Sequence, residues 1–145
     1  RFWQFNNGQA NLHKIEWDHR THELEKMLIG NQFEAIAKFK ELQAIKYKDA
    51  TETISNIIHT DDYHSAEFKK YLKRFWQLYW VELSAVEDAE VESAMVKLGE
   101  HLNIIEAKGF ENISAGEIEK LKTLGYRVAQ AIKSSSKNWE LPQKN

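Results

Sequence analysis

Apolar residues recur every three or four positions along most of this chain, which is the spacing of one face of an α-helix. From position 33 the pattern predicts a helix that buries one face made of Phe33, Ile36, Phe39, Leu42, Ile45, Tyr47, Ala50, Ile54 and Ile57. The segment 11–29 has sparser apolar positions and is also expected to be helical. Because one glycine in a helix interior costs only about 1 kcal/mol, a long first helix, kinked or continuous at Gly30, is favoured over a break there.

Later helices are marked by start signals as well as by periodicity. Ser65 is expected to cap a helix whose buried stripe contains Phe68, Leu72, Phe75, Tyr79 and Val86. A bend is expected near 84–89, and Asp88 is expected to cap the helix that follows it. The spacing of that helix is typical of a coiled coil, at Val91, Met95, Leu98, Leu102 and Ile105. Ser114 and Glu117 form a capping box that opens a last helix with the inner face Ile118, Leu121, Gly125, Val128 and Ile132.

No segment alternates like a β-strand over more than a few residues, and no repeat of fixed period is present. The predicted fold is therefore all-α, an antiparallel helical bundle of four or five helices. The expected organisation is an N-terminal aromatic extension at 1–10, a single bundle domain at 11–139 and a disordered tail at 140–145 that contains Pro142.

Composition excludes several classes of protein. The 145 residues include 20 Lys+Arg against 22 Asp+Glu, and a net charge of -2 does not suggest a dedicated nucleic-acid binder. The absence of cysteine excludes disulfides, thiolate zinc sites and a cysteine nucleophile. The five Trp, five Tyr and seven Phe are unevenly placed, since seven of these rings fall between Tyr63 and Trp80.

The six histidines and the 22 acidic residues are the candidates for a metal or catalytic site. A carboxylate-bridged dimetal bundle needs two Glu-x-x-His motifs, and the chain has one, which places His19 three residues after Glu16. Two looser clusters, namely His19 and His22 with Glu16 or Glu23, and His59 and His64 with Asp61 and Asp62, are interpreted as polar surface. Crowded acids at Glu82, Glu87, Asp88, Glu90 and Glu92 are also interpreted as solvent-facing. No catalytic residue, metal or cofactor is predicted, and the chain is not expected to be an enzyme.

Two groups of residues are candidates for binding. Four basic residues are expected to share one helix face opposite the apolar stripe, namely Lys69, Lys70, Lys73 and Arg74. This face would bind phosphates or anionic headgroups, or it would form only the solvent-facing side of the helix. Three rings near the predicted bend, Trp76, Tyr79 and Trp80, are the second candidate, either as packing or as an aromatic pocket. If Trp80 is buried, Trp80→Ala is expected to cost about 3–5 kcal/mol.

Three aromatic residues, Phe2, Trp3 and Phe5, lie beside Arg1 at the start of the sequence. Aromatic rings next to a cation are favoured at a bilayer–water interface, so one hypothesis is that a membrane anchor precedes residue 1. The alternative is an extension that packs on the bundle.

The stretch FWQLYWVEL at 75–83, followed by VEDAEVE at 86–92, AMV at 94–96 and LG at 98–99, resembles a group of uncharacterised bacterial proteins. In that group a short membrane-spanning segment precedes a soluble helical domain. YRVA at 126–129 and SKNW at 136–139 are similar to its C-terminal helix, so the resemblance covers about residues 60–140. It implies a membrane-tethered helical domain and no particular activity. The domain is separately expected to be cytoplasmic rather than periplasmic.

Three functions follow as hypotheses. The first is a non-enzymatic interaction or scaffold domain that works through a protein partner or self-association. The second is a ligand- or signal-sensing bundle with an aromatic pocket at Trp76, Tyr79 and Trp80. The third, and least favoured, is a metal-dependent enzyme.

Overall fold

The computed structural model describes residues 22–138. The predictions for the aromatic extension at 1–10, for the start of the first helix at 11–21 and for the tail at 140–145 lie outside the described residues. The chain divides into two units, residues 1–40 and 41–145, and each is considered by itself.

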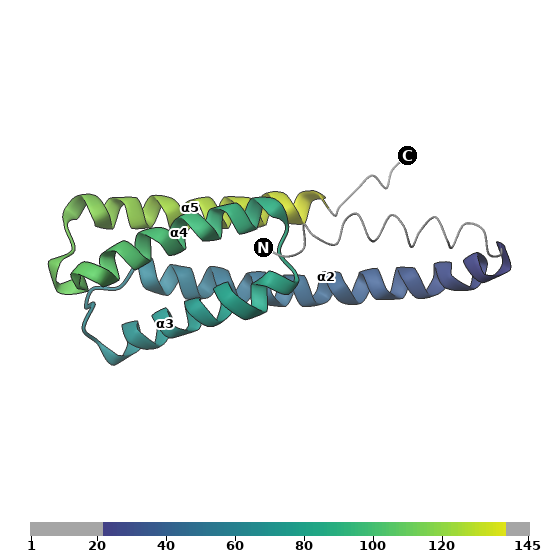
Figure 1. Ribbon diagram of the computed structural model, residues 1–145, viewed down its shortest axis with the longest axis horizontal. Coiled ribbons are helices and arrows are strands. Elements are labelled where there is room, and N and C mark those ends of the chain that lie inside the picture. The colour runs from purple at the N-terminus through teal and green to yellow at the C-terminus, as the bar shows by residue number, and fades with distance from the viewer. Residues whose placement is uncertain (1–21, 139–145) are drawn as a thin grey trace. The chain divides into compact units, whose positions relative to one another are not determined.

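Four α-helices account for most of the described chain (Figure 1). They are α2 (His22–Ile58), α3 (Ala66–Gln77), α4 (Ala89–Lys108) and α5 (Ala115–Asn138), with a π-helix η2 at Leu78–Glu82 and short 3-10 helices η3 at Leu83–Ala85 and η4 at Phe110–Asn112. Residues 22–138 contain no strand, so the predicted all-α helical bundle is confirmed. The helix α2 passes through Gly30 without interruption, which confirms that no break occurs there.

The predicted caps set the starts of three helices. The side chains of Ser65 and Asp88 each accept a hydrogen bond from the backbone amide three residues later, at 3.0 and 3.1 Å. In the capping box Ser114 Oγ accepts from the Glu117 amide at 3.1 Å, and Glu117 Oε1 accepts from the Ser114 amide at 2.9 Å. These bonds satisfy amides that have no partner inside the helix, which explains why the sequence located the helix starts well.

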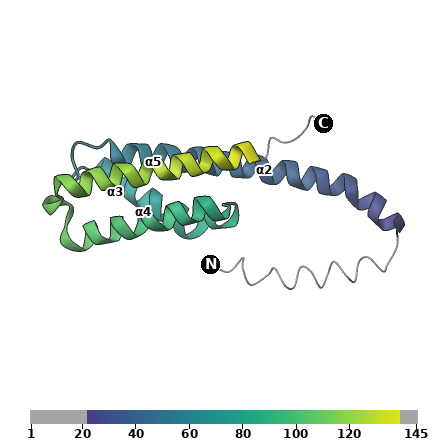
Figure 2. The ribbon, with the colours of Figure 1, turned by 90° about the horizontal axis from the view of Figure 1, so that it is seen from above.

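The core of the second unit lies among α3, α4, α5 and the C-terminal part of α2. In the ribbon α4 and α5 lie side by side and run antiparallel (Figures 1 and 2). The predicted α4 stripe is fully buried, and so is most of the predicted α5 face, at Leu121, Gly125 and Val128. The side chains that fill this core are Phe68, Phe75, Leu78, Leu83, Val91, Met95, Leu98, Leu102, Leu121 and Val128.

The predicted continuous face of α2 is buried only in part. Tyr47, Ala50, Ile54 and Ile57 are buried, as expected. The other members, Phe33, Ile36, Phe39, Leu42 and Ile45, are all exposed, so the prediction was wrong for these five. Positions three apart drift around a helix of 3.6 residues per turn by about 60° at each step, so the five residues from Phe33 to Ile45 do not share one face. Leu42 and Ile45 therefore lie on a different side of α2 from the buried Gln43 and Tyr47.

The chain turns from α3 to α4 through a π-helix. The amide of Leu83 donates to the carbonyl of Leu78, five residues back, where an α-helix would bond four residues back. This wider turn allows both leucines to be completely buried although they are five positions apart. Val86 is buried just beyond η3, and the bend predicted at 84–89 is confirmed.

A buried polar clamp holds α2 against this bend. Gln43 Nε2 donates to the Val86 carbonyl at 2.7 Å, and the Tyr47 hydroxyl accepts from the Asp88 amide at 3.2 Å. Burial raises the pKa of Tyr47, so its hydroxyl stays protonated at all physiological pH values. The clamp therefore gives hydrogen-bond partners to backbone groups that leave the helical ladder at the bend.

Candidate interaction surfaces

The described residues of the first unit present an apolar stripe on α2, formed by Ile29, Phe33 and Ile36. These positions are separated by four and three residues and therefore share one helix face. Their exposed fractions are 50%, 69% and 47%. Large apolar side chains gathered in this way are unusual on a protein that works alone, because each leaves its apolar surface in water.

A second surface lies at the corner formed by the end of α3 and η2, and we call it the aromatic corner (Phe75, Trp76, Tyr79 and Trp80). The structure brings together the three rings predicted from the sequence. Edge-to-face contacts join Trp76 to Tyr79, with centroids 5.1 Å apart, and Tyr79 to Trp80, at 4.7 Å. Phe75, which is completely buried, contacts Trp76 at 5.0 Å and anchors the group in the core.

The aromatic corner is supported from α4 by a close approach. A Cβ atom placed on Gly99 would lie 2.7 Å from Cε2 of Tyr79, so only glycine leaves room for the ring in this position. Trp80 and Val81 are 65% and 68% exposed. Trp80 of the corner and the adjoining Val81 therefore face solvent. The sequence had left open whether Trp80 is buried, and the structure shows that it is exposed.

Replacing Trp80 with alanine is expected to lower the free energy of unfolding by about 0.5–1.5 kcal/mol, not by the about 3–5 kcal/mol of a buried ring. The loss comes from the edge contact with Tyr79, because most of the Trp80 surface is in water in the folded state. Chemical denaturation of the variant and the parent measures it. A loss of the size typical of buried rings would contradict the exposed position.

The four basic residues predicted to share one face of α3 have different surroundings in the structure. Lys69, Lys70 and Lys73 are exposed, whereas Arg74 is half-buried and held by two carboxylates. Its guanidinium donates to Asp49 of α2 and, through Nη2, to Oε1 of Glu82 at 2.9 Å. These hydrogen bonds raise the pKa of Arg74 further above its ordinary value. Arg74 therefore links α2, α3 and η2 and is not available to bind a phosphate.

Lys46 completes this ion-pair network by donating to Glu82 Oε1 at 2.8 Å. The hydrogen bond from Arg74, followed by that from Lys46, lowers the pKa of Glu82 to about 2. Beside the network, a groove of about 640 Å³ between α2 and α3 is lined by acids and bases in equal number, namely Asp49, Glu52, Glu67, Lys70, Lys73 and Arg74. This mixture does not favour an anionic ligand.

Replacing Glu82 with glutamine is expected to weaken the pH dependence of stability at acid pH. Because the pKa of Glu82 is lowered in the folded state from 4.5 to about 2, its contribution is present above about pH 4.5 and is lost as the pH falls toward about 2. Denaturation at neutral pH and at about pH 3 measures this loss in parent and variant. Glu119→Gln, at an exposed glutamate of α5, is the matched control and should keep the parent's slope. Equal slopes in all three proteins would contradict the assignment.

The metal clusters considered from the sequence find no support in the described residues. His59 Nδ1 lies 2.8 Å from the Ser55 carbonyl, and Asp62 Oδ1 accepts from the His64 amide at 2.9 Å. Among residues 29–137, whose side chains the structure describes, no three histidines or acids come together as a possible metal site. Glu16 and His19, and the side chains of His22 and Glu23, lie outside the described part of the chain. Of the acids at 82–92, Glu82 serves the ion-pair network and Asp88 caps α4.

The sequence reasoning missed Ile29 as part of an exposed stripe and Gln43 as a buried residue. A signal for Ile29 was present, because its spacing from Phe33 continues the apolar pattern across Gly30. No comparable signal marked Gln43, a polar residue whose burial depends on a carbonyl 43 positions away.

Fold and surfaces together define an all-α bundle with exposed apolar patches. The sequence matches no known family model, and no match was found among curated proteins or among solved structures. None of the described helices is both long enough and apolar enough to cross a membrane.

Proposed function

We propose that this chain is a non-enzymatic helical interaction domain of a membrane-tethered bacterial protein, and that the Ile29–Phe33–Ile36 stripe of α2 pairs with an amphipathic helix of another protein chain. The observation that carries the proposal is the exposure of these three side chains, between 47% and 69%. Grooves and helices that bind a partner helix recognise residues with this spacing. The first partner to test is a second copy, because a two-fold pairing places the same patch on both chains.

One further observation supports an interaction role rather than catalysis. Among the described residues, the two carboxylates with a strongly lowered pKa, Glu82 and Glu117, owe it first to a hydrogen bond from a basic side chain of the bundle, from Arg74 and Lys108 respectively. A general acid needs the opposite shift, toward neutral pH. The tether is supported by the resemblance of residues 60–140 to bacterial proteins with a membrane-spanning segment.

Sedimentation velocity across a wide concentration range tests the pairing. The parent is expected to form a larger species as its concentration rises, and Phe33→Glu is expected to remain a monomer because it places a charge in the stripe. Asn31→Glu is the matched control, since Asn31 is exposed on the other side of the same helix turn and gains the same charge. Loss of association in both variants would show an effect of charge alone and contradict the stripe.

A photo-crosslinking amino acid at position 33 extends the test to other partners, with position 31 as the control. Crosslinking in cells to a separate protein chain from position 33 alone supports the proposal. A parent that remains monomeric and gives crosslinks from position 33 only to residues 1–21 of its own chain would overturn it. The tether is tested separately by reading the coding sequence upstream of Arg1 for an apolar stretch of about 20 residues.

A further inference from the structure

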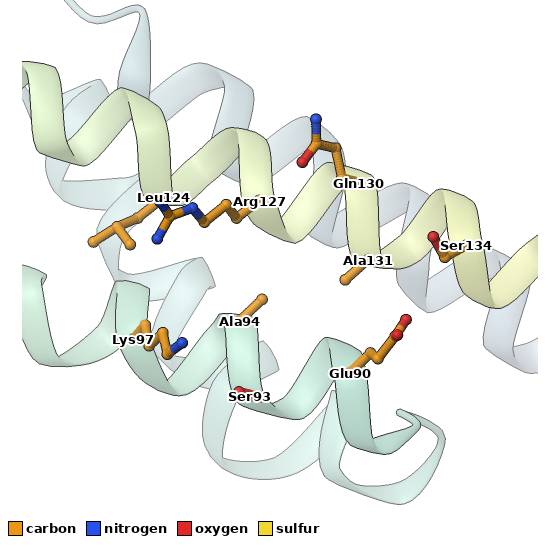
Figure 3. A pocket seen from close by; sticks show the side chains of 9 residues that line it. All are labelled: Glu90, Ser93, Ala94, Lys97, Leu124, Arg127, Gln130, Ala131 and Ser134. Atoms are coloured by element: carbon orange, nitrogen blue, oxygen red, sulfur yellow. The ribbon is translucent and has the colours of Figure 1, made fainter.

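A groove between α4 and α5 lies apart from the surfaces described above (Figure 3). Its volume is about 330 Å³, which falls at the lower end of the range for small-molecule sites. All of its lining residues belong to the second unit, and they come from the two antiparallel helices.

Small side chains create this groove. Ala94 of α4 and Ala131 of α5 face each other across it in Figure 3, and Ser134 continues the row of small residues one turn further along α5. Larger apolar residues at such positions would fill the space between the helices, as the leucines do in the core. The alanines instead leave an apolar floor that is open to solvent.

Charged groups are separated along the groove. Lys97 from α4 and Arg127 from α5 lie at the same end, while Glu90 extends toward Ser134 at the other end (Figure 3). Neither Lys97 nor Arg127 forms an ion pair with a described residue. Two cations therefore converge from different helices with no anion between them, and a single carboxylate lies at the far end.

We propose that this groove binds a short zwitterionic peptide, with its terminal carboxylate at Lys97 and Arg127 and its terminal ammonium group at Glu90. Carboxylate recognition by an arginine and a lysine, and ammonium recognition by a carboxylate, are charge-assisted and directional. The apolar floor at Ala94 and Ala131 takes small side chains.

The length of the ligand follows from helix geometry. Glu90 and Lys97 are seven residues apart on α4, which corresponds to about 10.5 Å along the helix axis. An extended chain covers about 3.3–3.6 Å per residue, so a peptide of about three residues spans the two charged ends. Because the charged side chains at both ends are exposed, the affinity is expected to be modest, with a dissociation constant of about 1 mM.

Titration of the full chain with Ala-Ala-Ala, followed by amide chemical shifts, tests the proposal. Saturable shifts are expected at groove amides of α4 and α5, and both N-acetyl-Ala-Ala-Ala and Ala-Ala-Ala-amide are expected to bind at least about fivefold more weakly. Equal binding of all three peptides would overturn the zwitterionic assignment, and so would shifts that do not saturate.

Variants test the location. Arg127→Gln is expected to weaken binding of Ala-Ala-Ala by about fivefold, whereas Lys133→Gln, which removes an exposed cation of α5 outside the groove, is expected to leave it unchanged. Ala131→Leu is expected to abolish binding by filling the floor without any change of charge. An equal effect of Arg127→Gln and Lys133→Gln on binding, or unchanged binding by a folded Ala131→Leu variant, would overturn the site. If the Ala131→Leu variant does not fold, the comparison of Arg127→Gln with Lys133→Gln still tests the site.

Discussion

Replacing Phe75 with alanine is expected to lower the free energy of unfolding by about 3–5 kcal/mol, the largest effect of any substitution considered for this chain. Phe75 is completely buried and contacts both Trp76 and Tyr79. The variant therefore loses the burial of a whole ring and leaves a cavity beneath the aromatic corner. A loss of this size is a large share of the stability of an ordinary domain.

Chemical denaturation measures this change, with Tyr126→Ala as the matched control. Tyr126 is also an aromatic residue on a helix of the second unit, but it is 57% exposed, so its loss is expected to be within about 0.5 kcal/mol. Similar losses in the two variants would mean that Phe75 is not the anchor of the corner.

Replacing Gln43 with leucine is expected to cost about 1–3 kcal/mol, although leucine is the more apolar residue. Gln43 is buried, and its amide group donates to the Val86 carbonyl at 2.7 Å. Leucine cannot replace this donor, so the carbonyl stays at the bend without the hydrogen bond from α2. The penalty is that of an unsatisfied polar group, which outweighs the gain from burying a more apolar side chain.

Gln130→Leu provides the comparison, because Gln130 is exposed on α5 and the same substitution there is expected to change stability by less than about 0.5 kcal/mol. A Gln43→Leu variant as stable as the parent in denaturant titrations would show that the clamp contributes nothing to stability.

The sequence predicted those parts of the fold that depend on local chemistry. Ser65, Asp88 and Ser114 each bond to an amide only three residues away, so the residue types at short spacing were sufficient to locate the helix starts. The apolar stripe of α4 was also predicted from local spacing, because residues alternately four and three positions apart lie on one side of a regular helix.

The parts that could not be predicted depend on distant partners. Arg74 was grouped with three lysines by its position on the helix, but its role is set by Asp49, which lies 25 positions away. Trp80 is carried into solvent by a π-helical turn, and a pattern based on the ordinary helical period does not signal such a turn.

The aromatic corner also gives this protein an optical signature. Its rings meet at interplanar angles of 81°, 71° and 77°, from Phe75 through Trp76 and Tyr79 to Trp80. Aromatic rings fixed in such an asymmetric arrangement produce near-ultraviolet circular dichroism, which vanishes when side-chain packing becomes fluid even if the helices persist. Near- and far-ultraviolet spectra of this protein, taken together, can therefore separate the packing of its ordered rings, the corner among them, from the helix content of the chain.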